Sequence, residues 1–280
     1  MKLKYATVLL ISALNFIPTS NVLPWGDKGH KLTASKAFEC LPSELSFMLR
    51  WKKDIVEHAP DPDHRKKGDK TEAPKHFIDI DYYQEFQKGT LILNQDSLKS
   101  KYGEKVFLEQ GILPWATEAT LENLTKAFRQ MDTSAIKLYA SDLAHYVADG
   151  FQPQHATVNY DGKLTGQKGI HFRYEITMLD SNLTELEKEV RPEDAYFVSE
   201  PEKYIFSYID GADMYAETIL SADRFAFKAS GEKYDGNYYK LMWFRTKHMT
   251  VQQIDSAARA LASLYYTAWV NAGKPVAHNN

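Results

Sequence analysis

The sequence predicts an all-α protein built as a single multi-helix domain. Apolar residues recur at three- and four-residue steps along most of the chain, which is the spacing of one buried helix face. The alternation of apolar and polar residues that marks a half-buried strand is scarce. Neither an internal repeat nor a low-complexity linker divides the chain, so one helical domain from about residue 25 to residue 273 is the simplest arrangement.

The first residues are typical of a secretory signal peptide. Lys2 and Lys4 precede "YATVLLISALNFI", an apolar run too short to span a bilayer securely, and "PTSN" follows with small and turn-forming residues. We therefore expect residues 1–24 to be a signal peptide with a cleavage site between 20 and 24, and residues 25–280 to form the exported, secreted or periplasmic, domain. The alternative is an ordinary buried first helix.

Helical patterns then follow one another along the chain. They are "HKLTASKAFECL" and "LPSELSFMLRWKKDIVEHA", then "LPWATEATLENLTKAFRQM" and "DTSAIKLYASDLAHYVADGF", and finally two or three helices that include "EKYIFSYIDGADMYAETILSADRFAF" and "TVQQIDSAARALASLYYTAWVNAG". Pro114 suits a first helical turn, and the Asp-Thr-Ser run at 132–134 suits a helix cap. Turn residues place loops at 59–75 and 156–169.

Composition excludes some classes of protein. A chain of 280 residues can bury a sizeable core, and 25% charged residues is ordinary for a globular protein. The net charge of −3, which becomes −5 without Lys2 and Lys4, argues against a strongly basic nucleic-acid surface. The one cysteine, Cys40, cannot form an intramolecular disulfide; we expect a small buried hydrophobic side chain, with a zinc ligand as the alternative.

The stretch "HYVADGFQPQH" concentrates candidate metal ligands. His145 and Asp149 are four residues apart, so on a helix their imidazole and carboxylate groups point to the same side. Pro153 should end that helix and bring His155 to a neighbouring position. One such pair is weak evidence, because solvated helix faces contain many.

A second pair strengthens the case for a metal centre. In "GIHFRYE", His171 and Glu175 repeat the four-residue spacing. Imidazole with carboxylate suits zinc, and a catalytic zinc site leaves one coordination position for water. Upstream, "HAPDPDHRK" offers Asp61 and Asp63, and "PKHFIDID" offers His76.

Further candidates lie just past the signal, where "WGDKGH" contains Trp25 and His30. If processing frees Trp25, its α-amino nitrogen and carbonyl oxygen could chelate a metal, which only an N-terminal residue can do. However, Pro24 fits poorly before a cleavage site, and a cut after Ser20 suits the small-residue rule better. We therefore expect either further trimming to Trp25 or a weakly held metal there.

Together these residues resemble the zinc-dependent phospholipase C/P1 nuclease superfamily. The family pattern is an N-terminal Trp, a nearby His, an Asp, a His some fifteen residues on, then H-x3-D-x5-H and H-x3-E or H-x3-D. This chain matches it over its mature part up to about Glu175, and the match uses five of its nine histidines. The matching residues are Trp25, His30, Asp61, His76, His145, Asp149, His155, His171 and Glu175.

The resemblance implies three zinc ions and a phosphoesterase fold made of helices. By analogy, the first zinc is held by Asp61, His76, His145 and Asp149. The second is held by His155, His171 and Glu175. The third is held by Trp25, His30 and Asp149. Asp149 would bridge two zincs, and Asp61 would accept a proton from the attacking water.

The resemblance leaves two substrate classes open, a phospholipid headgroup at a membrane surface or single-stranded nucleic acid; no protein partner is implied. Glu175 in place of the nuclease Asp, the segment from His145 onward and the lone cysteine favour the phospholipase branch. Lys28, where that branch usually has the choline-binding Glu, disfavours phosphatidylcholine as the particular substrate.

Two residues favour the nuclease branch instead. Phe77 and Asp79 in "HFID" correspond to a Phe that stacks on a base and an Asp that reads the base edge, and such stacking contributes about 1–3 kcal/mol per base. The alternative roles are core packing for Phe77 and a helix cap or support of a zinc ligand for Asp79. A third hypothesis is a zinc-loaded protein that binds a phosphate ligand without turnover.

Overall fold

All regular structure in the described part of the chain is helical, in agreement with the predicted class. The computed structural model describes residues 26–89 and 94–275, and these residues contain no β-strand. The predicted signal peptide and Trp25 lie outside the described residues. Within the described residues, no helix combines the length and apolar character needed to cross a membrane.

The first half of the chain consists of short helices followed by two long ones. They are α1 (Gly26–Ala37), the 3-10 helix η1 (Ser43–Trp51), α2 (Lys52–His58), α3 (Asp61–Arg65), η2 (Ala73–His76), η3 (Ile80–Tyr82), α4 (Gln84–Gln87), α5 (Gln95–Tyr102), α6 (Glu104–Glu109), α7 (Leu113–Gln130) and α8 (Thr133–Gly150). The second half contains η4 (Pro153–His155), η5 (Lys163–Thr165), α9 (Ile170–Phe172), the π-helix η6 (Arg173–Met178), α10 (Leu179–Ser181), α11 (Leu183–Glu189), α12 (Pro201–Asp213), α13 (Ala216–Ala229) and α14 (Gly236–Asn271).

The predicted ends of α7 and α8 are confirmed. Pro114 lies in the first turn of α7, where its missing N–H costs no hydrogen bond. The Asp132 side chain caps α8 by accepting hydrogen bonds from the amides of Ser134 and Ala135. Helix α8 ends at Gly150, and Pro153 begins the short turn η4 that carries His155.

Helix α8 is the central element of the fold. It packs against α1, α2, α3, α7, α12 and α14, and residues 143–150 are buried all round. Gly150 allows the close approach of α12, since a Cβ there would lie 2.5 Å from Tyr208 Cε2. This second half of α8 has no solvated face, so its polar residues must find partners inside the protein.

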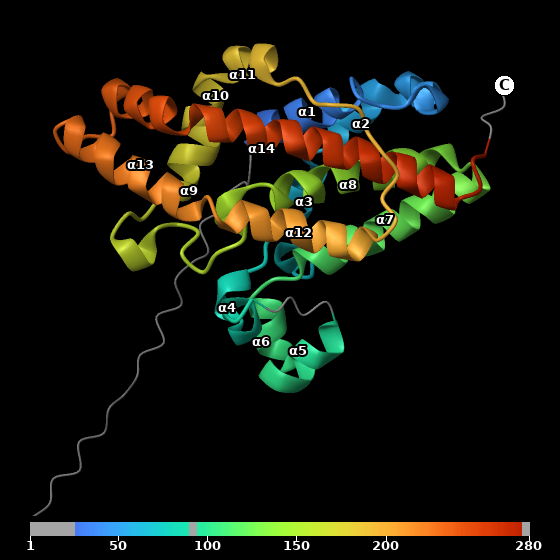
Figure 1. Cartoon of the computed structure of the whole chain (residues 1–280), viewed down its shortest axis with the longest axis horizontal. Coiled ribbons are helices and arrows are strands. Elements are labelled where there is room, and N and C mark those ends of the chain that lie inside the picture. The colour runs from blue at the N-terminus through green and yellow to red at the C-terminus, as the bar shows by residue number, and fades with distance from the viewer. Residues whose placement is uncertain (1–25, 90–93, 276–280) are drawn as a thin grey trace, which may run out of the picture.

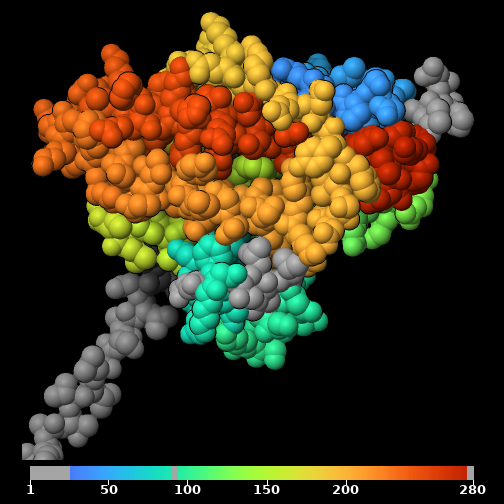
Figure 2. Space-filling model, in the orientation of Figure 1, coloured from blue at the N-terminus to red at the C-terminus, as the bar shows by residue number. Residues whose placement is uncertain are grey.

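Tertiary packing changes some predicted helix boundaries. The pattern at 202–227 is two helices, α12 and α13, and the C-terminal helix α14 begins at Gly236, well before the predicted start. In Figure 1, α14 runs along the molecule above α8, while α4, α5 and α6 project at the lower edge. The same projection stands out in the space-filling view of Figure 2.

The apolar side chains form two buried clusters. The larger one joins α1, α2, α7, α8 and α12 to the C-terminal half of α14, and the smaller one joins α9–α11 and α13 to its N-terminal half. Cys40 belongs to the larger cluster, where burial raises the pKa of its thiol to about 12. This confirms Cys40 as a buried hydrophobic residue, and it belongs to none of the ligand groups described below.

Candidate metal centre

Three groups of buried histidine and carboxylate side chains meet beside α8. Within each group, one potential ligand atom from every residue lies within 4.8 Å of the others, close enough to hold a metal ion. The groups are Asp63, His76 and His145; His30, His145 and Asp149; and His155, His171 and Glu175. His145 is shared by the first two, and Asp149 of the second lies 3.4 Å from His155 of the third, so the groups form one connected centre.

The first group is centred on His145 of α8, with Asp149 of the second group beside it. The Nε2 atom of His145 lies 2.9 Å from Nδ1 of His76 and 3.2 Å from Oδ2 of Asp149. The same Asp149 oxygen is 3.1 Å from His76 Nδ1. Asp63, on α3, places Oδ1 3.4 Å from His76 Nδ1 and 3.6 Å from His145 Nε2. Asp63 and Asp149 thus both approach the facing nitrogens of His76 and His145.

The second group adds His30 from α1. Its ring stacks on that of His145, with a centroid distance of 3.8 Å, and its Nε2 lies 3.6 Å from Oδ1 of Asp149. The two oxygens of Asp149 thus face different histidines, Oδ2 toward His76 and His145 and Oδ1 toward His30. This is the arrangement needed for a carboxylate that bridges two cations.

The third group also lies next to Asp149, whose Oδ1 is 3.4 Å from His155 Nδ1. His155 Nε2 is 3.2 Å from His171 Nε2 and 3.5 Å from Oε1 of Glu175, and His171 Nε2 contacts Oε2 of the same carboxylate. Glu175 is fully buried, yet neither of its oxygens receives a well-directed hydrogen bond within the described part of the chain. A buried carboxylate left in that state is expected where a cation binds.

Backbone carbonyls orient two of the imidazoles. His145 Nδ1 is 2.9 Å from the Ala59 carbonyl, and His155 Nδ1 is 2.7 Å from the His76 carbonyl. A neutral histidine that donates Nδ1–H in this way has only a lone pair on Nε2. Both Nε2 atoms face the ligand groups, which is the usual support for a metal-ligating histidine.

Burial keeps two of the histidines neutral. It lowers the pKa of His30 and of His145 to about 4. For Glu175, burial raises the pKa, but the charges of His171 and His155 outweigh burial and lower the pKa of this carboxyl group to about 2. Neutral imidazole and ionised carboxylate are the forms that bind metal.

His155 shows the opposite shift. Burial lowers its pKa, but the charges of Asp149 and Glu175 outweigh this effect, so the pKa is raised above its ordinary value. Without a cation, these carboxylates favour a proton on His155. A metal ion would supply the same positive charge.

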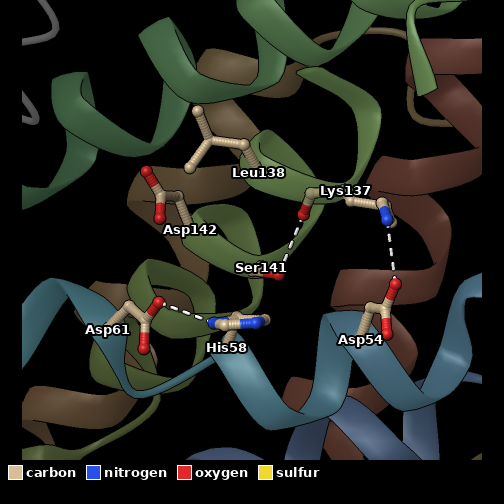
Figure 3. Close-up of a pocket in the computed structure, with 7 residues that line it drawn as sticks. All are labelled: Asp54, His58, Asp61, Lys137, Leu138, Ser141 and Asp142. Carbon is tan, nitrogen blue, oxygen red and sulfur yellow. Dashed lines mark hydrogen bonds and ion pairs between the residues drawn. The ribbon is translucent and has the colours of Figure 1, made fainter. Parts of the chain in front are cut away.

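The structure brings Asp63, and not the expected Asp61, next to the other candidate ligands. Asp61 Oδ2 pairs with His58 Nδ1 at 2.8 Å, and its side chain is 46% exposed. Both residues line a surface pocket of about 260 Å³ between α2, α3 and α8 (Figure 3). Asp61 therefore lies away from the other donors.

Helix geometry explains the exchange. Asp61 and Asp63 both belong to α3, and side chains two residues apart on a helix point in nearly opposite directions. Asp63 is the buried one of the two, at 1% exposure. The sequence offered both aspartates, and only the packing of α3 against α8 selects between them.

Lys66 is a neighbouring residue that the sequence analysis did not identify. Its ammonium group lies 2.6 Å from Asp63 Oδ1, and its side chain is 20% exposed, so it reaches the centre from the solvent side. The Asp-x-x-Lys spacing on one short helix was the available signal. A cation here can balance the charge of Asp63 or of a bound anion.

Phe77 and Asp79 lie outside the three ligand groups. Phe77 is half-buried, and its carbonyl accepts a hydrogen bond from the Leu113 amide. The Asp79 side chain precedes η3 but does not cap it. Burial and the nearby charge of Asp81 raise the pKa of Asp79 to about 7. The cap interpretation of Asp79 is therefore wrong.

No family model matches this sequence, and no curated protein matches it.

Proposed function

We propose that this chain is a zinc-dependent phosphodiester hydrolase of the phospholipase C/P1 nuclease type, with a phospholipase C-like substrate. The observation that carries the proposal is the convergence of the three ligand groups through His145 and Asp149. Histidine nitrogen with carboxylate oxygen is the ligand chemistry that zinc prefers in catalytic sites. The spacing of these ligands along the chain resembles that of the superfamily, with Asp63 in place of Asp61.

Asp63, His76, His145 and Asp149 would hold one zinc, and His155, His171 and Glu175 a second. His30 and Asp149 would contribute to a third, together with Trp25. Zinc at such positions lowers the pKa of water toward neutrality and withdraws charge from a phosphoryl oxygen.

The protein side chains have separate tasks in this proposal. Burial raises the pKa of Asp63 against the attraction of His30 and Lys66, which suits a carboxylate that accepts a proton from an attacking water. Lys66 Nζ lies beside this carboxylate and can neutralise a phosphoryl oxygen. Buried, neutral His30 and His145 keep the centre free of competing protons.

Apolar residues near His171 support a lipid substrate. The Tyr160 ring lies 5.7 Å from the His171 ring, and Leu164 and Phe172 are 72% and 51% exposed. Tyr160 and Leu164, which lie between His155 and His171, and Phe172, directly after His171, thus belong to the segment that carries two of the proposed ligands. A lipid interface is the kind of surface that such residues contact favourably.

A P1/S1-like nuclease is the second candidate. Its support is Asp79, which is partly exposed and has a pKa of about 7. At neutral pH this side chain could therefore either donate a hydrogen bond to a base or accept one from it. Phe77, directly after His76, is the accompanying aromatic residue.

A substrate panel on the zinc-reconstituted protein tests both candidates. The panel contains bis-p-nitrophenyl phosphate, phospholipids with several headgroups, single-stranded DNA, RNA and nucleoside 3′-monophosphates, each with and without chelator. We expect chelator-sensitive hydrolysis of the generic diester and of a phospholipid. Hydrolysis of nucleic acid alone would favour the nuclease. Zinc binding without turnover of any substrate would favour the third hypothesis, a zinc-loaded protein that binds a phosphate ligand without hydrolysing it.

A further inference from the structure

We propose that Glu72 is a positioning residue of the metal centre, which holds His76 and joins the three segments that supply the ligands of the first zinc. This inference rests on the proposed metal centre and concerns the layer of side chains behind it. Glu72 lies four residues before His76 and is 2% exposed. A buried carboxylate in this position is a partner for the ring nitrogen of His76 that faces away from the metal.

The two nitrogens of His76 have different surroundings. Nδ1 faces Asp149 and His145, whereas Nε2 points away from the ligand groups, toward Oε1 of Glu72 at 3.7 Å. His76 Nε2 is buried and has no hydrogen-bond partner among the residues described. A small rotation of the ring would close this distance, so that Nε2–H is donated to Glu72 and the lone pair stays on Nδ1.

Glu72 also joins the backbone segments that carry the ligands. The Tyr146 hydroxyl, on α8 next to His145, donates to Oε1 of Glu72. The Lys75 ammonium donates to Oε2 at 2.9 Å. One carboxylate thus contacts both the turn η2, which carries His76, and the helix α8, which carries His145 and Asp149.

Arg65 completes the connection to α3. It lies two residues after Asp63, and its Nη2 is 3.4 Å from Oε1 of Glu72. Its two terminal nitrogens also donate to both oxygens of Asp142 on α8, each at 2.9 Å. The bidentate geometry fixes the Arg65 side chain, and through it the segment that presents Asp63.

Two cations lie against the Glu72 carboxylate. Lys75 Nζ is 2.9 Å from Oε2, and Arg65 Nη2 is 3.4 Å from Oε1. A carboxylate partner strengthens an imidazole as a metal ligand by drawing on its Nε2–H.

The test compares Glu72→Gln with the wild type and with a matched control. Glu85 is the control, because it also accepts hydrogen bonds from a tyrosine hydroxyl and a lysine ammonium, of Tyr102 and Lys101, but contacts no proposed ligand. Zinc affinity is measured by competition with a chelator, and thermal unfolding is followed with and without zinc. We expect one zinc to bind about 10–100-fold more weakly in Glu72→Gln and no change in Glu85→Gln.

Two outcomes overturn the proposal. The first is wild-type zinc affinity in Glu72→Gln; if the melting temperature of the metal-free variant falls at the same time, the role of Glu72 is purely structural. The second uses the wild type alone and therefore does not depend on the variant folding. In nitrogen-15 spectra of the zinc-loaded protein, His76 should carry its proton on Nε2, and the opposite tautomer contradicts the inference. Absence of zinc binding by the wild type would instead overturn the proposed function.

Discussion

Asp149 is the residue through which the parts of the candidate centre are joined. Its Oδ2 faces His76 and His145, and its Oδ1 faces His30 at 3.6 Å and His155 at 3.4 Å. Burial raises its pKa, but the charges of His145 and His155 outweigh this and lower the pKa well below its ordinary value. A carboxylate held ionised at this point can serve two cations at once.

We expect Asp149→Asn to lose zinc from two of the three sites and nearly all hydrolytic activity. The amide keeps the shape of the side chain but removes the charge and one acceptor oxygen. Metal content per chain, measured by elemental analysis after desalting, checks this, and the site at His155, His171 and Glu175 should stay occupied. Retention of three zincs with wild-type turnover would show that Asp149 does not bridge.

Asp63 and Asp61 provide a comparison between two aspartates on one short helix. Asp63→Asn should reduce zinc content and lower activity by on the order of 100-fold, because it removes a buried ligand. Asp61→Asn should leave zinc content unchanged and activity within about twofold, since substitutions of exposed residues usually have small effects. If Asp61→Asn lost more zinc and more diester hydrolysis than Asp63→Asn, Asp61 would be the ligand.

At the scale of the element, a glycine turn positions the segment that carries His76. The chain at 110–113 makes three backbone hydrogen bonds to 74–79: Ile112 N to Pro74 O, Leu113 N to Phe77 O, and Asp79 N to Gln110 O. Gly111 lies at this contact with φ +85°, and a Cβ there would overlap the Phe77 carbonyl. Only glycine allows both the left-handed conformation and the close approach.

We therefore expect Gly111→Ala to destabilise the fold by about 3 kcal/mol or more and to weaken zinc binding at His76. Gly166→Ala is the matched control: its φ is +76° in the left-handed region, but nothing lies within 4 Å of its added Cβ, so only the backbone cost of about 1–2 kcal/mol should appear. Denaturant unfolding and chelator competition measure both effects. Equal destabilisation by the two substitutions would show that the contact with Phe77 is not tight.

The helix that carries His171 and Glu175 also differs from a regular α-helix. His171 lies on α9, whereas Glu175 lies on the π-helix η6, whose wider turn changes the angle between residues four apart. π-Helical turns are rare and often occur at functional sites. Arg173 holds this turn through Asp223 at 3.0 Å and the carbonyls of Gln167 and Lys168.

At the scale of the whole molecule, the buried histidines make the stability of the metal-free protein depend on pH. The pKa of His30 and of His145 falls from 6.5 to about 4 on folding, so the unfolded chain binds more protons between these values. The free energy of unfolding should therefore decrease as the pH falls from about 6.5 toward 4, by at most on the order of 3 kcal/mol for each histidine.

The effect of His155 on stability has the opposite dependence on pH. Its pKa is raised in the folded protein, so the stability that it contributes is fully present at pH values below its ordinary pKa. This stability is lost as the pH rises through the raised pKa. Denaturant unfolding of the metal-free protein at several pH values should give a free energy of unfolding with a maximum near neutrality. Saturating zinc should increase this free energy most at alkaline pH, because the metal replaces the proton on His155. A flat profile between pH 4 and 7 would contradict these assignments.

Several features of the fold and the centre follow from the sequence alone. The helical class, the cap at Asp132, the end of α8 before Pro153 and the common direction of His145 and Asp149 depend on the local periodicity and turn chemistry of the chain. His155, His171 and Glu175 follow from spacing within a short stretch.

Only the tertiary structure decided the remaining features. The choice of Asp63 over Asp61, the π-helical turn under Glu175 and the contact of Glu72 with both η2 and α8 depend on how each short helix packs against a long one, α3 and η2 against α8 and η6 against α14. Short helices have little amphipathic pattern of their own, so their orientation comes from burial against residues distant in the sequence. Local pattern determines which side chains are available as ligands, and packing around the long helices, above all the buried second half of α8, determines which of them meet.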